Sequence, residues 1–305
     1  MRLVTRSDFD GLACAMMLKE LGKIDEISFV HPKDVQDGKI ELSENDITTN
    51  LPYDPRVGIA FDHHESEVDR LKAVETNGKL IIDENARSAA RVVYDYFGGK
   101  NTFKKISEEL MDAVDKGDSA DFTIDEILHP SGWTLLHFIM DARTGLGRFH
   151  NFRISNFDLM MQLIDKCMDH SIDEILELPD VKERVDLYFL EEKLFKEQLE
   201  RITKIDGKVA VIDLRNEDII HAGNRFMVYA MYPETQISVH VAWGFHKQNT
   251  AVMIGKSIIN KDSKVDIGNL CLKYGGGGHA NAGTCQLDNE TVDAQLGLII
   301  TALNE

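Results

Sequence analysis

The stretch GIAFDHH, residues 58–64, places an apolar run directly before three ionisable side chains. The run is too short for a helical period and indicates a buried strand, and Asp62, His63 and His64 follow at the strand's end. Open α/β sheets build their sites at strand ends, and imidazoles mixed with carboxylates suit divalent transition metals. The stretch therefore predicts a metal site, although a histidine pair on a solvated loop is the alternative.

A second acidic segment lies near the start of the chain. The pattern predicts a strand over residues 3–5 and a helix over 12–21, with Asp8, Asp10 and Gly11 in the turn between them. Gly11 allows the backbone to turn closely, so both carboxylates can converge on one cation. Turn chemistry alone explains an Asp-x-Asp-Gly sequence at least as often.

The remaining pattern predicts an α/β fold in two parts. Further strands are expected at 27–31, 46–51 and 80–82 and a helix at 88–97, which implies a mostly parallel sheet with helices on both faces. The chain then becomes helical, and strand-like periodicity returns at 209–213, 226–230, 237–242, 250–255 and 284–287. We therefore expect a metal-binding domain over 1–180, a helical connector over 181–205 and a smaller α/β domain over 206–305.

Two more segments can carry chemistry. Asp115 and Asp118 end an apolar helical segment, where either is a candidate ligand and solvated acids at a helix end are an equal alternative. Gly275 to Gly278 are consecutive glycines followed by His279, between a helix candidate and a strand. Exposed glycine N–H groups can form an anion-binding nest, to which His279 adds a donor; a flexible linker is the alternative.

Composition excludes several classes of protein. The net charge of −18 leaves no broad basic surface for gripping duplex DNA. No apolar run is long enough to span a bilayer and the N-terminus does not resemble a signal peptide, so we expect a cytoplasmic protein without a membrane partner. The four cysteines have no CxxC spacing, which argues against a structural zinc site or a disulfide framework: Cys14, Cys167, Cys271 and Cys285.

The Asp-x-Asp-Gly turn, the Asp-His-His strand end and the glycine run ending in His279, in this order, resemble the DHH phosphoesterase superfamily with its DHHA1 C-terminal domain. That superfamily includes exopolyphosphatase-like proteins, oligoribonucleases, cyclic-dinucleotide phosphodiesterases and relatives of the exonuclease RecJ. The resemblance covers nearly the whole chain. It implies that residues 1–180 form the DHH domain and 206–305 the substrate-binding DHHA1 domain.

The resemblance also implies roles for particular residues and a Mn²⁺ or Mg²⁺ cofactor of one or two ions. The implied metal ligands are Asp8, Asp10, His63 and Asp115, and the implied catalytic groups are Asp62 and His64. We add Arg6 as a catalytic candidate on its charge, although it departs from the family pattern. The implied substrate-binding residues are Lys256, Ser257, Gly276, Gly277, Gly278 and His279. The family's Arg-Ser position is Lys256-Ser257 here.

Two positions depart from the family pattern. No His or Asp precedes the first acidic pair, where Arg6 stands instead, and Asn50 stands where the family has a metal-bridging Asp. A neutral amide bridges two cations poorly, so we count Asn50 as a weakened ligand and expect reduced occupancy of one metal site. Arg6 can fill part of the vacated site or clamp a phosphate.

The resemblance therefore implies a metal-dependent enzyme that hydrolyses terminal phosphoanhydride or phosphodiester bonds. The expected substrate is polyphosphate or a short nucleotide chain held between the domains, with short single-stranded RNA or DNA as a partner and a homodimer as an assembly. Water activated by the cation would attack, and His64 would protonate the leaving group. The alternatives are a phosphate-ligand or nucleotide binding protein of the same fold that has lost efficient catalysis, and an acidic interaction partner.

Overall fold

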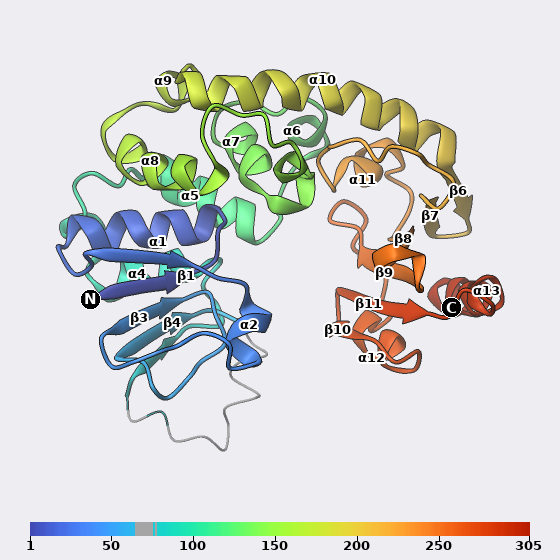
Figure 1. Cartoon of the computed structure of the whole chain (residues 1–305), viewed down its shortest axis with the longest axis horizontal. Coiled ribbons are helices and arrows are strands. Elements are labelled where there is room, and N and C mark those ends of the chain that lie inside the picture. Colours follow the sequence, from blue (N-terminus) through green and yellow to red (C-terminus); the bar gives the residue numbers. More distant parts are fainter. Residues whose placement is uncertain (65–75, 77) are drawn as a thin grey trace. The chain divides into compact units, whose positions relative to one another are not determined.

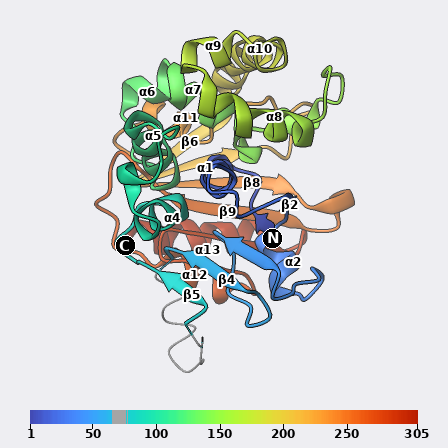
Figure 2. The ribbon, with the colours of Figure 1, turned by 90° about the vertical axis from the view of Figure 1, so that its left-hand side faces the viewer.

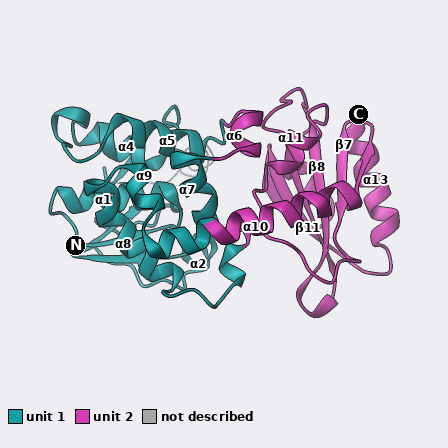
Figure 3. Ribbon diagram, turned by 90° about the horizontal axis from the view of Figure 1, so that it is seen from above, with its two compact units in different colours: residues 1–121, 131–142, 146–185 teal, residues 122–130, 143–145, 186–305 magenta. Residues whose placement is uncertain are grey.

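A computed structural model of the chain, in which residues 1–64, 76 and 78–305 are described, contains two compact units (Figures 1 and 3). The N-terminal unit comprises residues 1–121, 131–142 and 146–185. The C-terminal unit comprises residues 122–130, 143–145 and 186–305. The expected two-part α/β organisation is thus present, and short excursions of the chain between residues 122 and 145 belong to the second unit.

The N-terminal unit is built on a five-stranded, fully parallel sheet in the order β2-β1-β3-β4-β5. The chain adds β2 on one side of β1 and β3 on the other, so the strand order has a switch point between β1 and β3. Open α/β sheets bind ligands at such a point, outside the carboxyl ends of the strands. The loops that follow β1, β3 and β4 are therefore the expected place for a site. The strands are β1 (Arg2–Thr5), β2 (Glu26–Phe29), β3 (Asp46–Thr49), β4 (Ile59–Asp62) and β5 (Leu80–Ile82).

Both faces of this sheet are covered, as the sequence predicts. On one face lie α1 (Phe9–Glu20) and α4 (Ala89–Tyr96), which pack against each other (Figure 2). The Phe61 ring contacts the Tyr96 ring at the end of α4, with 5.3 Å between the centroids. On the other face, a buried apolar cluster includes Val35 of α2 (Pro32–Gln36). The expected α/β class is confirmed.

The remaining helices of this unit surround α1, whose residues Phe9 to Leu18 are all buried. Helices α5 and α8 both contact α1, which makes it the centre of a helical layer. Serine hydroxyls cap α5, α8 and α9, at Ser107, Ser155 and Ser171. The bounds are α5 (Glu108–Asp118), α7 (Gly132–Met140), α8 (Asn156–Asp169) and α9 (Ile172–Leu176), and short 3₁₀ turns occur at 99–101, 142–144 and 146–148.

The longest described helix, α10 (Pro179–Ile202), contains most of the expected connector. The boundary between the two units falls within it, between residues 185 and 186. Its middle is rich in Glu and Lys, as a solvated helix requires. Among the described residues, no helix combines the length and the apolar character needed to cross a bilayer.

The C-terminal unit contains a six-stranded sheet in the order β10-β11-β9-β8-β7-β6, in which only β7 and β8 pair in parallel. Helices α12 (Ile267–Leu272) and α13 (Val292–Asn304) cover one face, and they share an apolar core with four of the strands. The predicted strands at 209–213, 237–242, 250–255 and 284–287 are confirmed. The strands are β6 (Thr203–Asp206), β7 (Val209–Asp213), β8 (Ile237–Trp243), β9 (Thr250–Lys256), β10 (Gly277–His279) and β11 (Ala282–Leu287), and a 3₁₀ turn occurs at 245–247.

The strand predicted at 226–230 is wrong, because this segment forms helix α11 (Met227–Met231). The run from Met227 to Ala230 is buried on every side, so it shows neither a period of 2 nor one of 3.6. Tertiary packing determines its conformation: α11 contacts α6 (Ile124–Leu128), and the Phe226 ring lies 5.6 Å from that of Phe122.

Candidate metal centre and active site

Asp10 lies inside the first turn of α1, not in the preceding loop as expected, because Asp8 already caps the helix. Its side chain is buried, and its two oxygens accept hydrogen bonds from Ala90 N (2.7 Å) and Ala89 N (3.2 Å) at the start of α4. Each oxygen keeps a further lone pair for a cation. Burial, then the charges of Asp118 and Asp8, raise the pKa of Asp10 well above its ordinary value.

His63 and Asp118 meet beside Asp10, although they come from β4 and α5. His63 Nε2 lies 2.9 Å from Asp118 Oδ2, and the contact lacks the alignment of a hydrogen bond. On the other side of the ring, Nδ1 lies 3.2 Å from the carbonyl oxygen of Ala86. A proton on Nδ1 donated to Ala86 leaves the Nε2 lone pair free, as metal-bound histidines require.

The charges of this pair reinforce each other in the absence of a cation. Burial by itself would lower the pKa of His63, but Asp118 and then Asp10 and Asp62 outweigh it and raise the pKa to about 9. Burial by itself would raise the pKa of Asp118, but His63 holds it below its ordinary value. Without a metal ion, the protonated His63 ring therefore offsets the negative charge of the nearby carboxylates.

These three residues fit a divalent cation. The ligand atoms of Asp10, His63 and Asp118 all lie within 4.8 Å of one another. Octahedral ligands about 2.1 Å from an ion lie about 3 Å apart, which matches the contact between His63 and Asp118. One buried carboxylate, one half-buried carboxylate and one imidazole are a donor set suited to Mn²⁺ or Mg²⁺.

Asp62 and His64 form a second, more exposed pair at the same strand end. His64 Nδ1 lies 2.7 Å from Asp62 Oδ1, which also accepts a hydrogen bond from His63 N at 2.8 Å. The His64 side chain is 39% exposed, whereas that of Asp62 is 3% exposed. The carboxylate therefore orients the ring and leaves its Nε2 toward solvent, where it can exchange a proton with a ligand.

Arg6 and Asp8 pair with each other at the edge of this group. Arg6 Nε lies 3.0 Å from Asp8 Oδ2, and Asp8 Oδ1 accepts a hydrogen bond from Gly11 N at 2.9 Å. Both side chains are partly exposed, at 32% and 21%. Asp8 is therefore engaged as a helix cap and an ion-pair partner, and Arg6 contributes positive charge next to the acids.

Asn50 lies at the end of β3, beside the end of β4, where its N–H donates to Phe61 O at 3.1 Å. Its φ of 54° is left-handed, and its side chain is buried without a hydrogen-bond partner on either amide atom among the described residues. A buried amide without a hydrogen-bond partner costs about 1–3 kcal/mol of folding free energy, so such a group is typically hydrogen-bonded by a ligand or by water.

Asp115, expected as a ligand, does not join Asp10 and His63. Its buried carboxylate accepts hydrogen bonds from Ser88 Oγ (2.6 Å) and from Arg91 Nη2 (2.6 Å). Asp118, one turn further along α5, occupies the place expected for it. The structure thus brings Asp118, and not Asp115, next to Asp10 and His63.

Lys256 is the last residue of β9 in the C-terminal unit, and Ser257 follows it. The buried Ser257 hydroxyl accepts from Ile259 N (3.1 Å) and Asn260 N (3.0 Å), so it shapes the following turn. Lys256 is half-buried and its backbone N–H donates to Asn281 O at 2.9 Å, which ties β9 to the hairpin of the glycine run.

The glycine run forms a tight hairpin, not a linker. Gly277, Gly278 and His279 constitute β10, which pairs antiparallel with β11. A Cβ on Gly276 would lie 2.0 Å from Thr284 O, and one on Gly278, whose φ is 154°, would lie 2.2 Å from Ala282 O. Close approach of the two strands therefore requires glycine at both positions, and His279 is exposed at the hairpin end.

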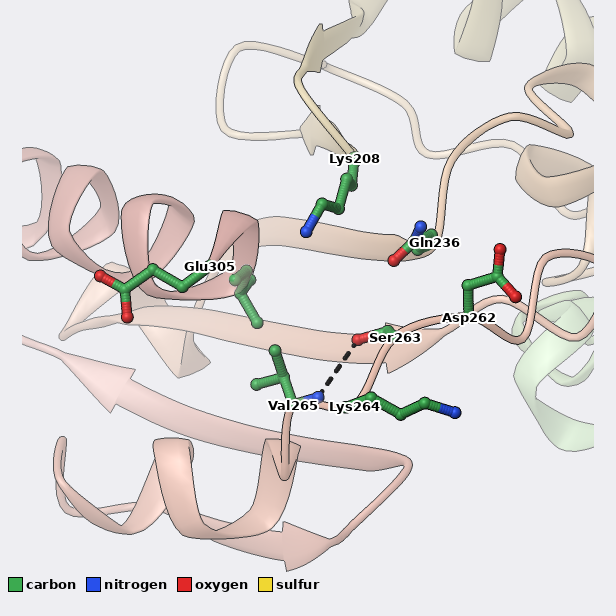
Figure 4. A pocket seen from close by; sticks show the side chains of 8 residues that line it. Lys208, Gln236, Asp262, Ser263, Lys264, Val265 and Glu305 are labelled. Carbon is green, nitrogen blue, oxygen red and sulfur yellow. Dashed lines mark hydrogen bonds between the residues drawn. The ribbon is translucent and has the colours of Figure 1, made fainter.

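A separate cavity of about 300 Å³ lies in the C-terminal unit (Figure 4). Its lining mixes both signs of charge and contains none of the residues predicted for substrate binding, so we do not assign it to the site. The lining residues are Lys208, Gln236, Asp262, Ser263, Lys264, Val265, Leu303 and Glu305.

Sequence reasoning missed the residues that hold the ligands in place. Ala86 supports His63, and the start of α4 supports Asp10. Ser88 before an Ala-rich helix is a recognisable cap, and an N-terminus of this kind attracts carboxylates. The sequence predicts a helix at 88–97, but it does not show which carboxylate the start of that helix binds.

Comparison with known proteins adds one close relative. The structure of a pGpG-specific phosphodiesterase, PggH from Vibrio cholerae, is 55% identical, covers 99% of this chain and 98% of that chain, and superposes with a TM-score of 0.88. The chain belongs to the DHH phosphoesterase superfamily. As a DHH protein it is an enzyme of the metal-dependent phosphohydrolase class, as the sequence implied.

More distant structures share only the DHH fold. An exopolyphosphatase-related protein from Bacteroides fragilis is 13% identical, with a TM-score of 0.54 and coverage of 100% of this chain and 93% of that chain. CDC45 from Entamoeba histolytica is 8% identical, with a TM-score of 0.50 and coverage of 100% and 95%. Neither a protein-family model nor a curated protein sequence matches the chain.

Proposed function

We propose that this DHH enzyme hydrolyses the phosphodiester bond of a short linear dinucleotide of the pGpG type. The observation that carries the proposal is the group of buried Asp10 and half-buried His63 and Asp118 beside the more exposed His64, in a chain 55% identical to a pGpG-specific phosphodiesterase. That degree of identity over nearly the whole chain also disfavours a binding protein without activity.

The proposed cofactor is one Mn²⁺ or Mg²⁺ ion held by Asp10, His63 and Asp118. When bound, the ion supplies the Lewis acidity that lowers the pKa of an attacking water and offsets charge on the phosphoryl oxygens. One ion, not two, is proposed because Asn50 cannot supply the charge of a bridging carboxylate.

The protein's own groups would perform the remaining steps. His64, oriented by Asp62 through Nδ1, would deliver a proton from Nε2 to the leaving oxygen. Arg6 would contact a phosphoryl oxygen, since its ion pair with Asp8 is partly exposed and uses Nε. Asn50 would satisfy its buried amide on the substrate or on an ordered water.

Further parts of the proposal concern the C-terminal unit and the partners. Lys256, together with Gly276, Gly277, Gly278 and His279 of the hairpin, would bind phosphate groups, with Ser257 shaping the adjacent turn. Short single-stranded RNA would be a secondary substrate, and cytoplasmic location and homodimer formation stay as predictions from the sequence.

The test compares turnover of pGpG, pApA, short RNA, a cyclic dinucleotide and polyphosphate by the purified protein with Mn²⁺, and with EDTA as the control. We expect pGpG to be cleaved fastest, and only with the metal. A matched variant, His64→Asn, should lower kcat by about 10²–10⁴-fold while Mn²⁺ binding is retained. Faster turnover of polyphosphate than of any dinucleotide would overturn the substrate class.

A further inference from the structure

Asp115 is a buried carboxylate that the proposed chemistry does not use. It is 5% exposed, and three hydrogen bonds satisfy it: Ser88 Oγ to Oδ1 at 2.6 Å, and Arg91 Nε and Nη2 to Oδ2 at 2.8 and 2.6 Å. Paired charge and filled hydrogen-bonding positions explain why this carboxylate can stay buried. Its partners both belong to the beginning of α4.

The two partners fix the N-terminus of α4. The Ser88 side chain caps the helix by accepting a hydrogen bond from Arg91 N at 3.0 Å. The next two backbone N–H groups, of Ala89 and Ala90, are those that hold the carboxylate of Asp10. A continuous series of hydrogen bonds therefore runs from Asp115, through the helix start, to Asp10.

Asp115 also fixes the rotation of its own helix. Asp118 is three residues further along α5, and residues at this spacing lie on the same side of a helix. With Asp115 bound to α4, Asp118 is directed to His63, at 2.9 Å. The same carboxylate therefore bears on two proposed ligands that come from different helices.

We propose that Asp115 is a positioning residue, which aligns Asp10 and Asp118 for the cation through Ser88 and Arg91 and is not itself a ligand. This role rests on the metal site proposed above. The inference predicts that Arg91 matters for metal affinity although it is a cation and cannot coordinate a metal ion.

The experiment measures the Mn²⁺ dissociation constant of the full chain by titration calorimetry, without substrate, for Asp115→Asn, Arg91→Gln and the double variant. Partners of metal ligands typically contribute 10–100-fold in affinity, so we expect each single variant to bind Mn²⁺ 10–100-fold more weakly. The double variant should be no weaker than the weaker single variant, because both remove the same link.

Asp112→Asn is the matched control, since Asp112 is on the same helix, its side chain is 82% exposed and it lies 3.7 Å from Arg91. It should bind Mn²⁺ as the unaltered protein does. Ser88→Ala is a milder variant for the case in which Asp115→Asn fails to fold, and it should weaken binding about tenfold. Thermal unfolding in EDTA verifies that each variant is folded.

The outcomes separate this role from the metal site itself. Unchanged Mn²⁺ affinity in folded Asp115→Asn or Ser88→Ala, with normal binding by the unaltered protein, would overturn the positioning role alone. Weakened binding in Asp115→Asn with unchanged binding in Arg91→Gln would instead identify Asp115 as a ligand. Absence of Mn²⁺ binding by the unaltered protein would overturn the metal site and, with it, this proposal.

Discussion

Replacing Asp118 with Asn should lower the pKa of His63 from about 9 toward the ordinary 6.5 in the metal-free protein. Burial by itself lowers this pKa, and Asp118 is the largest of the groups that raise it. The rise from the ordinary 6.5 to about 9 corresponds to about 3 kcal/mol in favour of the protonated ring. Asparagine keeps the shape of the side chain but removes its charge, so most of this energy should disappear.

The assay is an NMR titration of the histidine ring signals in EDTA. The His63 signal is assigned by its absence from His63→Gln, and Asp112→Asn serves as a control on the same helix. The control should leave the pKa of His63 near 9. A pKa that also stays near 9 in Asp118→Asn would refute the reasoning, because the pair would then not carry the shift.

The same pair should make the stability of the metal-free protein depend on pH. The raised pKa of His63 adds stability that is complete below 6.5 and lost as the pH rises toward about 9. The lowered pKa of Asp118 adds stability that is complete above 3.8 and lost as the pH falls. Urea unfolding should therefore show the largest deficit of Asp118→Asn at about pH 5–6, and a deficit that grows toward pH 9 would contradict this.

Three further predictions concern the metal and the hairpin. Asn50→Asp should raise the Mn²⁺ content of the chain above one ion, and calorimetry that finds the same stoichiometry would remove Asn50 from the site. Mn²⁺ affinity should increase about tenfold per pH unit between about 6.5 and 9, because His63 must release its proton; a flat profile would contradict a histidine ligand. Gly278→Ala should destabilise the C-terminal unit by about 2–4 kcal/mol in urea unfolding, because of its φ of 154° and the contact with Ala282 O. Gly277→Ala, where a Cβ would meet no atom within 4 Å, is the control and should be nearly neutral.

The order of the N-terminal elements could be predicted because short stretches of sequence indicate each element separately. Short apolar runs ending in polar residues identify β1 and β4, and the helix expected at 88–97 corresponds to α4. The run at 226–230 carries no such local signal, since it is apolar throughout, and its helix depends on packing against Phe122. Burial on all sides thus leaves this segment without a periodic pattern, and packing determines its conformation.

The candidate site could be predicted in part from the sequence. Asp10 and His63 follow β1 and β4, whose carboxyl ends lie at the same edge of the parallel sheet on either side of β3, so their convergence follows from the fold. The parallel sheet does not determine whether Asp115 or Asp118 joins them, because both residues lie on the same side of α5. The position of Arg91 on a different helix decides it, and that contact is visible only in the folded chain.

Anomalous scattering at the manganese edge, from crystals of the unaltered protein grown with Mn²⁺, tests the central claim most directly. We predict one strong peak within coordination distance of Asp10, His63 and Asp118, with Asp115 still bound to Arg91. A peak elsewhere, or none at these three residues, would contradict the metal centre and the mechanism built on it.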